Sequence, residues 1–404
     1  MMLAIMNAKY NAPYQFEPLL PAEALQEPLL AKAHDLTRAA TRLAGQSAPV
    51  ELRALLRGMN SYYTNRIEGQ HTRPSEIEQA LRKDFSANLD LAKRQRLAVA
   101  HIDTEAAVEQ RYQGIDGAHR LYSPEAIGDL HRELFARLPA PDLATAEGGA
   151  LTPGVLRKRD VTVGKHVAPV RASVPAFLQS WAAFYGNVRR GEAAVLALAA
   201  AHQRLGWIHP FTDGNGRVMR LHTHAVLTGL GYTGGLWSPL RGFARSTDRY
   251  FALLADADAP RQGDLDGRGN LSEKALAAWI DYVLDVCLDQ VQFMGGMLNL
   301  STMEHRIAAC LAFEEHTLKS GVRGEMLRPL HYLFVTGGEL DRGAFKAMTG
   351  LGERTAINAL SALLVRGLIR SDTPQGKVRF AFPHHALRFY FPALWPEAEA
   401  EAGA

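Results

Sequence analysis

The chain has 404 residues, of which 47% are hydrophobic and 22% are charged. A chain of this length exceeds one compact core and can fold without a stabilising disulfide or metal ion, which excludes a small disulfide scaffold. Its composition excludes a disordered chain. With 45 basic and 42 acidic residues the net charge is only +3, which excludes a global electrostatic field and requires any anion-binding surface to be local.

Two cysteines, Cys287 and Cys310, lie in helical patterns and are too few for a zinc site, so we interpret them as core residues in a reducing compartment. No stretch approaches the ~18 apolar residues of a membrane helix. The N-terminal sequence also lacks the basic leader and the apolar run of a signal peptide. We therefore expect a soluble, cytoplasmic protein with no membrane partner.

Helical periodicity dominates the chain up to about Cys310. The expected helices span 28–43, 50–67, 75–81, 89–112, 124–138, 174–188, 193–207, 217–230, 247–255 and 272–298. We expect Ser75 to cap the third of them, because Glu78 follows it at capping-box spacing. Alternating β-branched residues at 159–163, followed by Gly164 and a second extended segment, predict a small β-hairpin.

The pattern changes from about residue 324 onward. Three short helices are expected at 326–335, 342–348 and 353–366, and two extended segments follow them at 368–371 and 378–382. This order of helices and hairpin is the layout of a winged helix.

The third of these helices separates apolar from polar residues. Its expected core face consists of four residues: Ile357, Leu360, Leu363 and Leu364. Off this stripe and around the hairpin lie residues that suit contacts with DNA phosphates: Arg354, Asn358, Arg370, Lys377 and Arg379. Winged helices also mediate protein contacts, so the sequence leaves DNA binding and protein binding equally open.

The sequence HPFTDGNGRVMR at 209–220 offers the parts of a polyphosphate site. Gly214 and Gly216 can adopt positive φ and leave their N–H groups uncovered at the start of the next helix, whose dipole favours an anion. Arg217 and Arg220 lie on neighbouring positions of that helix, so both guanidinium groups can reach one polyphosphate.

The same stretch carries groups for metal binding and proton transfer. Asp213 offers the carboxylate that Mg²⁺ prefers when it shares its coordination with phosphates. Asn215 can donate from its amide to a phosphate oxygen, and His209 can take a proton at neutral pH. Each residue alone is more often an ordinary turn or surface residue, but together in one ordered run they predict transfer chemistry on a nucleotide.

This stretch matches the signature of Fic proteins, His-x-Phe-x-Asp/Glu-Gly-Asn-Gly-Arg-x-x-Arg, without departure, so the chain resembles the Fic family. The resemblance implies an all-α Fic helical fold with a small β-hairpin flap, to which this chain adds the C-terminal winged helix-turn-helix domain. It also implies a protein adenylyltransferase that moves AMP from ATP, with Mg²⁺, onto a Tyr, Ser or Thr hydroxyl of a target protein or of itself.

The resemblance assigns a role to each residue of the motif. His209 would deprotonate the target hydroxyl, Asp213 would hold Mg²⁺, and Phe211 would be the buried anchor of the loop. The residues expected to bind the phosphates are Gly214, Asn215, Gly216, Arg217 and Arg220. The hairpin resembles the flap that pairs with the backbone of the target, here Val161, Thr162, Val163 and Gly164.

The sequence TNRIEG at 64–69 resembles the inhibitory motif of Fic proteins, Ser/Thr-x-x-x-Glu-Gly/Asn. Thr64 and Glu68 share a helix face, and Gly69 suits the end of the helix. In the family such a glutamate pairs with the second arginine of the motif, here Arg220, and excludes a productive γ-phosphate. The resemblance thus implies an autoinhibited enzyme with its inhibitory helix in the N-terminal region, and in some such proteins the glutamate also supports removal of AMP.

We expect 1–110 to form an N-terminal helical region, 111–300 the Fic core, 301–323 a linker helix, 324–395 the winged-helix domain and 396–404 a disordered tail. Two other functions stay open. One is a Fic transferase of UMP, phosphocholine or phosphate, against which the complete Gly-Asn-Gly-Arg counts. The other is a DNA-binding regulator with a Fic-derived nucleotide sensor, against which the complete motif counts. A homodimer that controls inhibition is a further hypothesis.

Overall fold

The computed structural model describes residues 10–46, 48–145, 149–188 and 191–394, so the tail predicted at 396–404 lies outside the described residues. The protein is 65% helix and 4% strand, which confirms the predicted all-α class with small sheets. Among the described helices, none combines the length and the apolar composition that crossing a membrane requires.

The described residues form two units that are not simple halves of the chain. The first unit takes the residues up to Ala44, Asn60–Thr72 and Lys83–Val291, and the second takes Gly45–Met59, Arg73–Arg82 and the residues from Gln292 on. Helix α2 (Val50–Ile67) is therefore divided, because its beginning belongs to the second unit and its end to the first.

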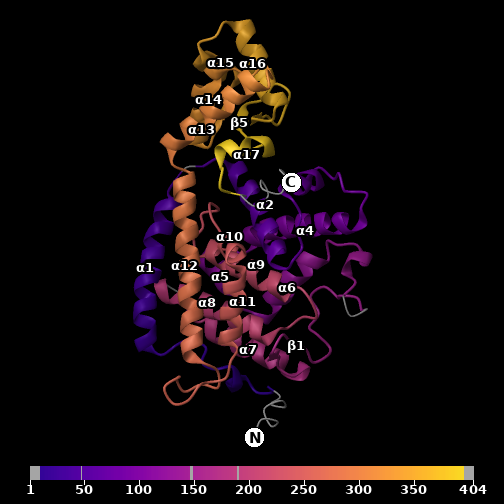
Figure 1. Cartoon of the computed structure of the whole chain (residues 1–404), viewed down its shortest axis with the longest axis vertical. Helices are drawn as coiled ribbons and strands as arrows, with labels where there is room; N and C mark the ends of the chain where they lie inside the picture. Colours follow the sequence, from indigo (N-terminus) through magenta and orange to yellow (C-terminus); the bar gives the residue numbers. More distant parts are fainter. Residues whose placement is uncertain (1–9, 47, 146–148, 189–190, 395–404) are drawn as a thin grey trace. The chain divides into compact units, whose positions relative to one another are not determined.

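The first unit is almost entirely helical. Its helices are α1 (Glu23–Ala44), α4 (Leu89–Arg111), α5 (Gly114–Arg120), α6 (Pro124–Phe135), α7 (Val174–Tyr185), α8 (Gly191–Ile208), α9 (Asn215–Gly229), α10 (Leu240–Arg245), α11 (Thr247–Ala257) and most of α12 (Glu273–Met297). Helix α8 packs against α1, α7 and α9, and α9 packs against α4, α5 and α6 (Figure 1). The motif loop therefore connects the two central helices of this unit.

Helix α8 is buried on nearly all sides because its side chains are mostly small. Two fully buried tryptophans lie against it and use their indole N–H groups on its backbone carbonyls. Trp181 donates to Ala201 at 3.0 Å, and Trp279 donates to Ala199 at 2.7 Å. These contacts satisfy the only polar group of each buried indole, so the helix that leads into the motif loop is held on two sides.

The second unit combines short helices with a three-stranded antiparallel sheet of order β3-β5-β4. Its elements are α3 (Pro74–Leu81), α13 (Leu300–Ala312), α14 (Leu327–Thr336), β3 (Glu339–Leu340), α15 (Arg342–Thr349), α16 (Glu353–Val365), β4 (Ile369–Arg370), β5 (Val378–Phe380) and α17 (His384–Tyr390). The three helices and two extended segments predicted after residue 324 are present, together with β3, which the sequence did not indicate. The winged-helix assignment stays a prediction.

One predicted core position of α16 was wrong. Ile357 is 45% exposed, whereas Leu360 and Leu363 are buried as expected. The buried face of this helix includes Ala356 and Ala359 instead, so the core stripe is rotated away from Ile357.

The predicted cap of α3 was also wrong. The helix begins at Pro74 rather than after Ser75, and Glu76 accepts the N–H of Arg73 at 2.7 Å. Proline at the first helical position has the right φ and no N–H to satisfy, so it sets the start of the helix in place of the serine.

Candidate active site

The motif loop is held in a fixed shape before any ligand arrives. The side-chain amide of Asn215 spans the loop, because its oxygen accepts the N–H of Phe211 at 2.9 Å and its nitrogen donates to the carbonyl of Phe211 at 2.9 Å. The Phe211 ring is fully buried, as expected for the anchor, and stacks on the His131 imidazole with ring centres 3.9 Å apart. The amide of Asn215, which the sequence suggested as a phosphate donor, is thus used inside the loop.

Gly214 is required by the geometry at the start of α9. Its φ is +81°, in the left-handed region that residues with a Cβ rarely adopt. A Cβ at this position would also collide with the Phe135 ring. The residue is the N-cap of α9, so this conformation turns the chain from the loop into the helix and leaves the first backbone N–H groups of α9 facing outward.

His209 precedes the loop and has an unusual backbone, with a φ of +49°. Its carbonyl accepts a hydrogen bond from Arg157 Nε at 2.8 Å, and the side chain of Arg157 also donates to the carbonyls of Arg159 and Pro169. Burial, together with the positive charge of Arg157 and the neighbouring His166, lowers the pKa of His209 to about 4. The imidazole is therefore neutral at pH 7 and able to accept a proton.

His131 supports the loop from behind. Its Nδ1 accepts the N–H of Gly154 at 2.8 Å, so its Nε2 carries the proton and donates to the carbonyl of Asp213 at 3.2 Å. Burial lowers the pKa of His131 to about 4, which keeps this neutral tautomer at pH 7. The Asp213 carboxylate accepts the N–H of Gly214 at 2.6 Å, so both its backbone and its side chain are fixed.

The two motif arginines are buried rather than directed into solvent. Arg217 and Arg220 are 3% and 1% exposed. Arg217 Nε donates to the side-chain oxygen of Asn65 at 3.1 Å, and Arg220 Nε donates to the Thr64 hydroxyl at 2.9 Å. Arg220 Nη2 donates to the Thr64 carbonyl at 3.2 Å. The end of α2 is thus bound directly to the first turns of α9.

Glu68 completes this contact, with its Oε1 2.5 Å from Nη2 of Arg220. A Cβ on Gly216 would collide with the same carboxylate oxygen, so Glu68 lies directly over the beginning of α9. Burial opposes the charge of Glu68, but Arg220 and Arg217 outweigh it and keep the pKa of Glu68 below its usual value. Gly69 follows with a φ of +71° and its N–H bonded to the carbonyl of Arg66 at 2.9 Å, which ends the helix.

The predicted hairpin is present as β1 (Thr162–Val163) and β2 (His166–Val167), which pair in an antiparallel ladder with Thr162 opposite Val167. Gly164 turns the chain with a φ of +62°, and the carbonyl of Val161 accepts the N–H of Ala168 at 3.2 Å. Val163 is 44% exposed. A short exposed strand of this kind leaves backbone groups for pairing with another extended chain.

Three residues that position the site were not singled out from the sequence. Asn65 lies inside the inhibitory motif at one of its variable positions, and His131 and Arg157 lie far from both motifs. A buried arginine and a buried histidine within helical or loop patterns give no periodic signal, so the sequence offered no means of finding them.

The comparisons with known proteins agree on the middle of the chain. The family model described as Fic/DOC family matches residues 121–227. The protein adenylyltransferase Fic of Drosophila virilis is 35% identical over 107 residues, which are 26% of this chain and 20% of that protein. The Drosophila mojavensis protein of the same name is 34% identical over 107 residues, covering 26% of this chain and 19% of its own. The match thus spans about a fifth of the length of these curated relatives.

Two solved structures share the fold of a larger part of the chain. A Fic family protein from Desulfovibrio desulfuricans G20 is similar over 93% of this chain and 99% of its own, with a TM-score of 0.52 and 17% identity. The Fic-1 fragment aa134–508 from C. elegans is similar over 69% of this chain and 74% of its own, with a TM-score of 0.51 and 17% identity. The matched family segment contains the hairpin and the whole motif loop, and residues 121–227 of this chain are a domain of the Fic/DOC family.

Proposed function

We propose that the protein transfers AMP from ATP to a hydroxyl group of a protein and that Glu68 restrains this activity. The observation that carries the proposal is the carboxylate of Glu68, which lies over Gly216 and 2.5 Å from Arg220. A carboxylate held at a helix N-terminus between buried guanidinium groups marks an anion site. The likeness to curated Fic adenylyltransferases supports ATP as the source of that anion.

The chemistry follows from the groups around the loop. The oxygen of the target hydroxyl forms a bond to the α-phosphorus of ATP, the bond from that phosphorus to the bridging oxygen breaks, and pyrophosphate leaves with the electron pair. His209, neutral because of its low pKa, takes the hydroxyl proton. Arg217, Arg220 and the backbone N–H groups at the start of α9 bind the phosphate oxygens. Asn215 then contributes through its backbone, because its side chain is engaged with Phe211.

Mg²⁺ fits the donor chemistry of this loop. The Asp213 carboxylate is fixed by the N–H of Gly214 at 2.6 Å and lies next to the phosphate-binding backbone. Asp213 would hold the ion, which would supply positive charge to the phosphates. The protein residues around it then bind and orient the nucleotide.

The hairpin β1–β2 is the surface to which we assign binding of the target protein. We assign Val161, Thr162, Val163 and Gly164 to pairing with an extended segment of the target, because β1 and β2 form an isolated two-stranded ladder with an exposed valine at its turn. Such pairing positions a hydroxyl through backbone groups, so it places little demand on the target sequence. The chain's own exposed hydroxyl groups are candidate substrates on the same grounds.

Inhibition is a competition for one guanidinium group. Arg220 bonds to the Thr64 hydroxyl, the Thr64 carbonyl and Glu68, so the end of α2 occupies much of its hydrogen-bonding capacity. A γ-phosphate oxygen can use the same fork only if Glu68 leaves it. A hydrogen bond to a charged group is worth about 1.5–3 kcal/mol, so removing Glu68 should raise the rate of transfer by about 10- to 150-fold.

The experiment is label transfer from α-³²P-ATP and γ-³²P-ATP, with Mg²⁺, to the protein itself and to a lysate. It compares wild type, Glu68→Gly, Glu68→Gln, His209→Ala and the double variant Glu68→Gly/His209→Ala. The matched control is Glu304→Gln, which removes an exposed carboxylate on α13 of the second unit. We expect weak α-label for wild type and Glu304→Gln, strong α-label for both Glu68 variants and none for the double variant. Label from γ-³²P-ATP would show that the protein transfers a phosphoryl group instead of AMP. The absence of label in every variant would refute the proposal.

The DNA-binding alternative gains no support from Arg379, one of the basic residues of the hairpin β4–β5. Its guanidinium contacts Glu51 at 2.8 Å, Glu339 at 3.1 Å and Asp372 at 2.6 Å. A cation with three carboxylate partners has little positive charge left for a phosphate. Transfer of another nucleotide, removal of AMP and control by a homodimer are tested by repeating the assay with UTP and CTP, with AMP-modified protein, and over a range of protein concentrations.

A further inference from the structure

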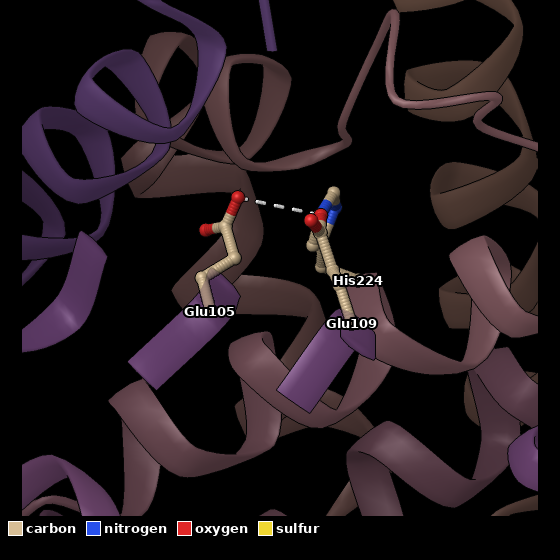
Figure 2. A group of neighbouring side chains, drawn as sticks. All are labelled: Glu105, Glu109 and His224. Atoms are coloured by element: carbon tan, nitrogen blue, oxygen red, sulfur yellow. Dashed lines mark hydrogen bonds and ion pairs between the residues drawn. The ribbon is translucent and has the colours of Figure 1, made fainter. Parts of the chain in front are cut away.

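A second cluster of ionisable groups lies between α4 and α9. Glu105 and Glu109 are one turn apart on α4, and both side chains reach His224 of α9 (Figure 2). The Nε2 atom of His224 is 3.0 Å from Oε1 of Glu109 and 3.4 Å from Oε1 of Glu105. The side chains of Glu105 and His224 are 1% and 3% exposed, so two carboxylates and an imidazole converge in the interior of the first unit.

The donor atoms have the spacing of a coordination site. One oxygen from each glutamate and Nε2 of His224 lie within 4.8 Å of one another. Bonds of about 2.0–2.1 Å from zinc to nitrogen or oxygen in a tetrahedron place neighbouring ligand atoms about 3.3 Å apart. The 3.4 Å separation of His224 Nε2 from Glu105 is long for a charge-assisted hydrogen bond, which is typically about 2.7–2.9 Å. It matches the edge of a metal tetrahedron instead.

A third feature points to a ligand at this place. His101, one turn before Glu105 on α4, is fully buried, and its Nδ1 lies 3.7 Å from Oε2 of Glu105. Within the described residues neither of its ring nitrogens has a hydrogen-bond partner. An imidazole without a partner in the interior is costly unless something else binds there.

A neighbouring side chain also holds one of the proposed metal ligands in a fixed orientation. Asn60, on α2, donates from its amide to Oε1 of Glu105 at 2.8 Å, which fixes the direction of the carboxylate. The charge is appropriate too, because two carboxylates and a neutral imidazole balance one divalent cation. Mixed nitrogen and oxygen donors with this spacing favour zinc over the hard ions magnesium and calcium, which take oxygen ligands.

We infer that Glu105, Glu109 and His224 bind a divalent transition-metal ion, with zinc as the best fit, and that Asn60 orients the site. The fourth position of the tetrahedron faces His101 or a water molecule. This site uses none of the residues assigned to the nucleotide, and the ion would join α4 to α9 one turn beyond Arg220 on α9. It would also fix Asn60, one turn before Thr64 on α2, so the metal would hold together the helices that bring Glu68 onto Arg220.

The test uses the full chain, freed of any affinity tag and of metal by dialysis against a chelator. Binding of ZnCl₂, MnCl₂ and MgCl₂ is measured by competition with a chromophoric chelator, and bound zinc is counted by mass spectrometry of the element after desalting. The variants are Glu109→Gln, His224→Gln and Asn60→Ala. The controls are Glu304→Gln and His305→Gln, which change the same residue types on the surface of α13. Circular dichroism confirms that each variant is folded.

We expect one tightly bound zinc in wild type and in both controls, and none retained after desalting in Glu109→Gln and His224→Gln. Asn60→Ala removes the hydrogen bond that orients Glu105 and should weaken zinc binding by about 10- to 100-fold. Cobalt provides a check that does not depend on affinity, because a tetrahedral site with a nitrogen ligand gives visible absorption bands that Glu109→Gln should abolish. No saturable zinc or cobalt binding to folded wild type, or equal binding by folded Glu109→Gln, would overturn the inference.

Discussion

The motif loop of the first unit and the β4–β5 hairpin of the second unit both hold arginines against carboxylates, but the number of carboxylates in contact with each guanidinium group differs. At the loop, the buried Arg217 and Arg220 have a single glutamate, Glu68, close to them, and only Arg220 is bonded to it. Asp213 also interacts electrostatically with Arg217, so the two arginines face two carboxylates, and the helix terminus adds positive potential to the site.

At the β4–β5 hairpin, one arginine contacts three carboxylates. Arg379 contacts Glu51, Glu339 and Asp372, so its charge is fully compensated within its own unit. The difference teaches that the number of basic residues around a turn says little about anion binding. What matters is how many carboxylates contact each guanidinium group, which is one for Arg220 and three for Arg379.

The largest effect should come from the proton acceptor at the motif loop. His209→Ala in the Glu68→Gly background should lower the rate of AMP transfer by about 10²–10⁴-fold, because no neighbouring group replaces a positioned base. The measurement is the initial rate of α-³²P incorporation at saturating ATP. Retention of more than a tenth of the rate would mean that His209 is not the base. As a control, the affinity for ATP, measured with a fluorescent ATP analogue, should be unchanged.

Substitution of Arg220 and of Arg379 by glutamine tests the difference between the motif loop and the β4–β5 hairpin. In the Glu68→Gly background, Arg220→Gln should lower transfer by about 10²–10³-fold, since each well-placed donor to the developing charge contributes about 2.7–4 kcal/mol. Arg379→Gln should leave transfer unchanged. Equal losses from the two substitutions would show that both arginines serve the nucleotide.

Acid should destabilise the first unit in particular. Burial lowers the pKa of His209 and His131 to about 4, and of His101 and His222 to about 3. Below pH 6.5 the unfolded chain takes up protons that the folded chain refuses, so stability is lost as the pH falls from 6.5 toward those values, by about 1.4 kcal/mol per pH unit for each histidine. Urea unfolding at pH 7, 6 and 5 measures this slope.

The control for that slope is a variant with one buried histidine removed. His222→Gln should reduce the slope by the share of one histidine, whereas His305→Gln on the exposed face of α13 should not change it. A free energy of unfolding that is flat between pH 7 and 5 would contradict the assignment of these histidines as neutral. Zinc bound beside His101 would hold its pKa low as well, so the experiment is done in a chelator.

The smallest effect is expected for the stability of the hairpin. Arg379→Gln breaks ion pairs that are partly exposed to solvent, with the arginine side chain 25% exposed. Such pairs each contribute no more than about 1 kcal/mol, and salt screens them. Because the three pairs are lost together, the free energy of unfolding of the second unit should fall by at most about 3 kcal/mol, and the loss should shrink at high salt. A loss that is independent of salt would mean that packing, not charge, explains the contact.

The sequence predicted the helices well wherever their pattern was long and amphipathic. Helix α2 spans 50–67 as expected, and α6 and α7 begin at the predicted residues but end three residues earlier. The short helices α5, α10 and α17 were missed, since six or seven residues are too few to show a period. The strand β3 was missed for the same reason.

At the site, local motifs were informative and distant partners were not. The loop and the inhibitory motif are continuous stretches, so their residues could be chosen by type and spacing. The engagement of the Asn215 amide with Phe211 depends on how the loop closes, which the spacing does not state. His224 and the glutamates of α4 are separated by more than a hundred residues, and nothing in either helix pattern relates them.

The divided helix α2 has a consequence for how such a protein can be taken apart or recombined. The second unit is assembled from three separate stretches of chain, two of which lie within the N-terminal quarter. A gene fusion that exchanged only the residues after 291 would leave Leu52, Leu56 and Ile77, which are buried in the whole protein, without the rest of their unit. Exchange of the C-terminal part alone would therefore remove the packing partners of these residues. The helix that carries Thr64 at its end also contributes its beginning to the second unit, so the inhibitory motif and the second unit share one helix.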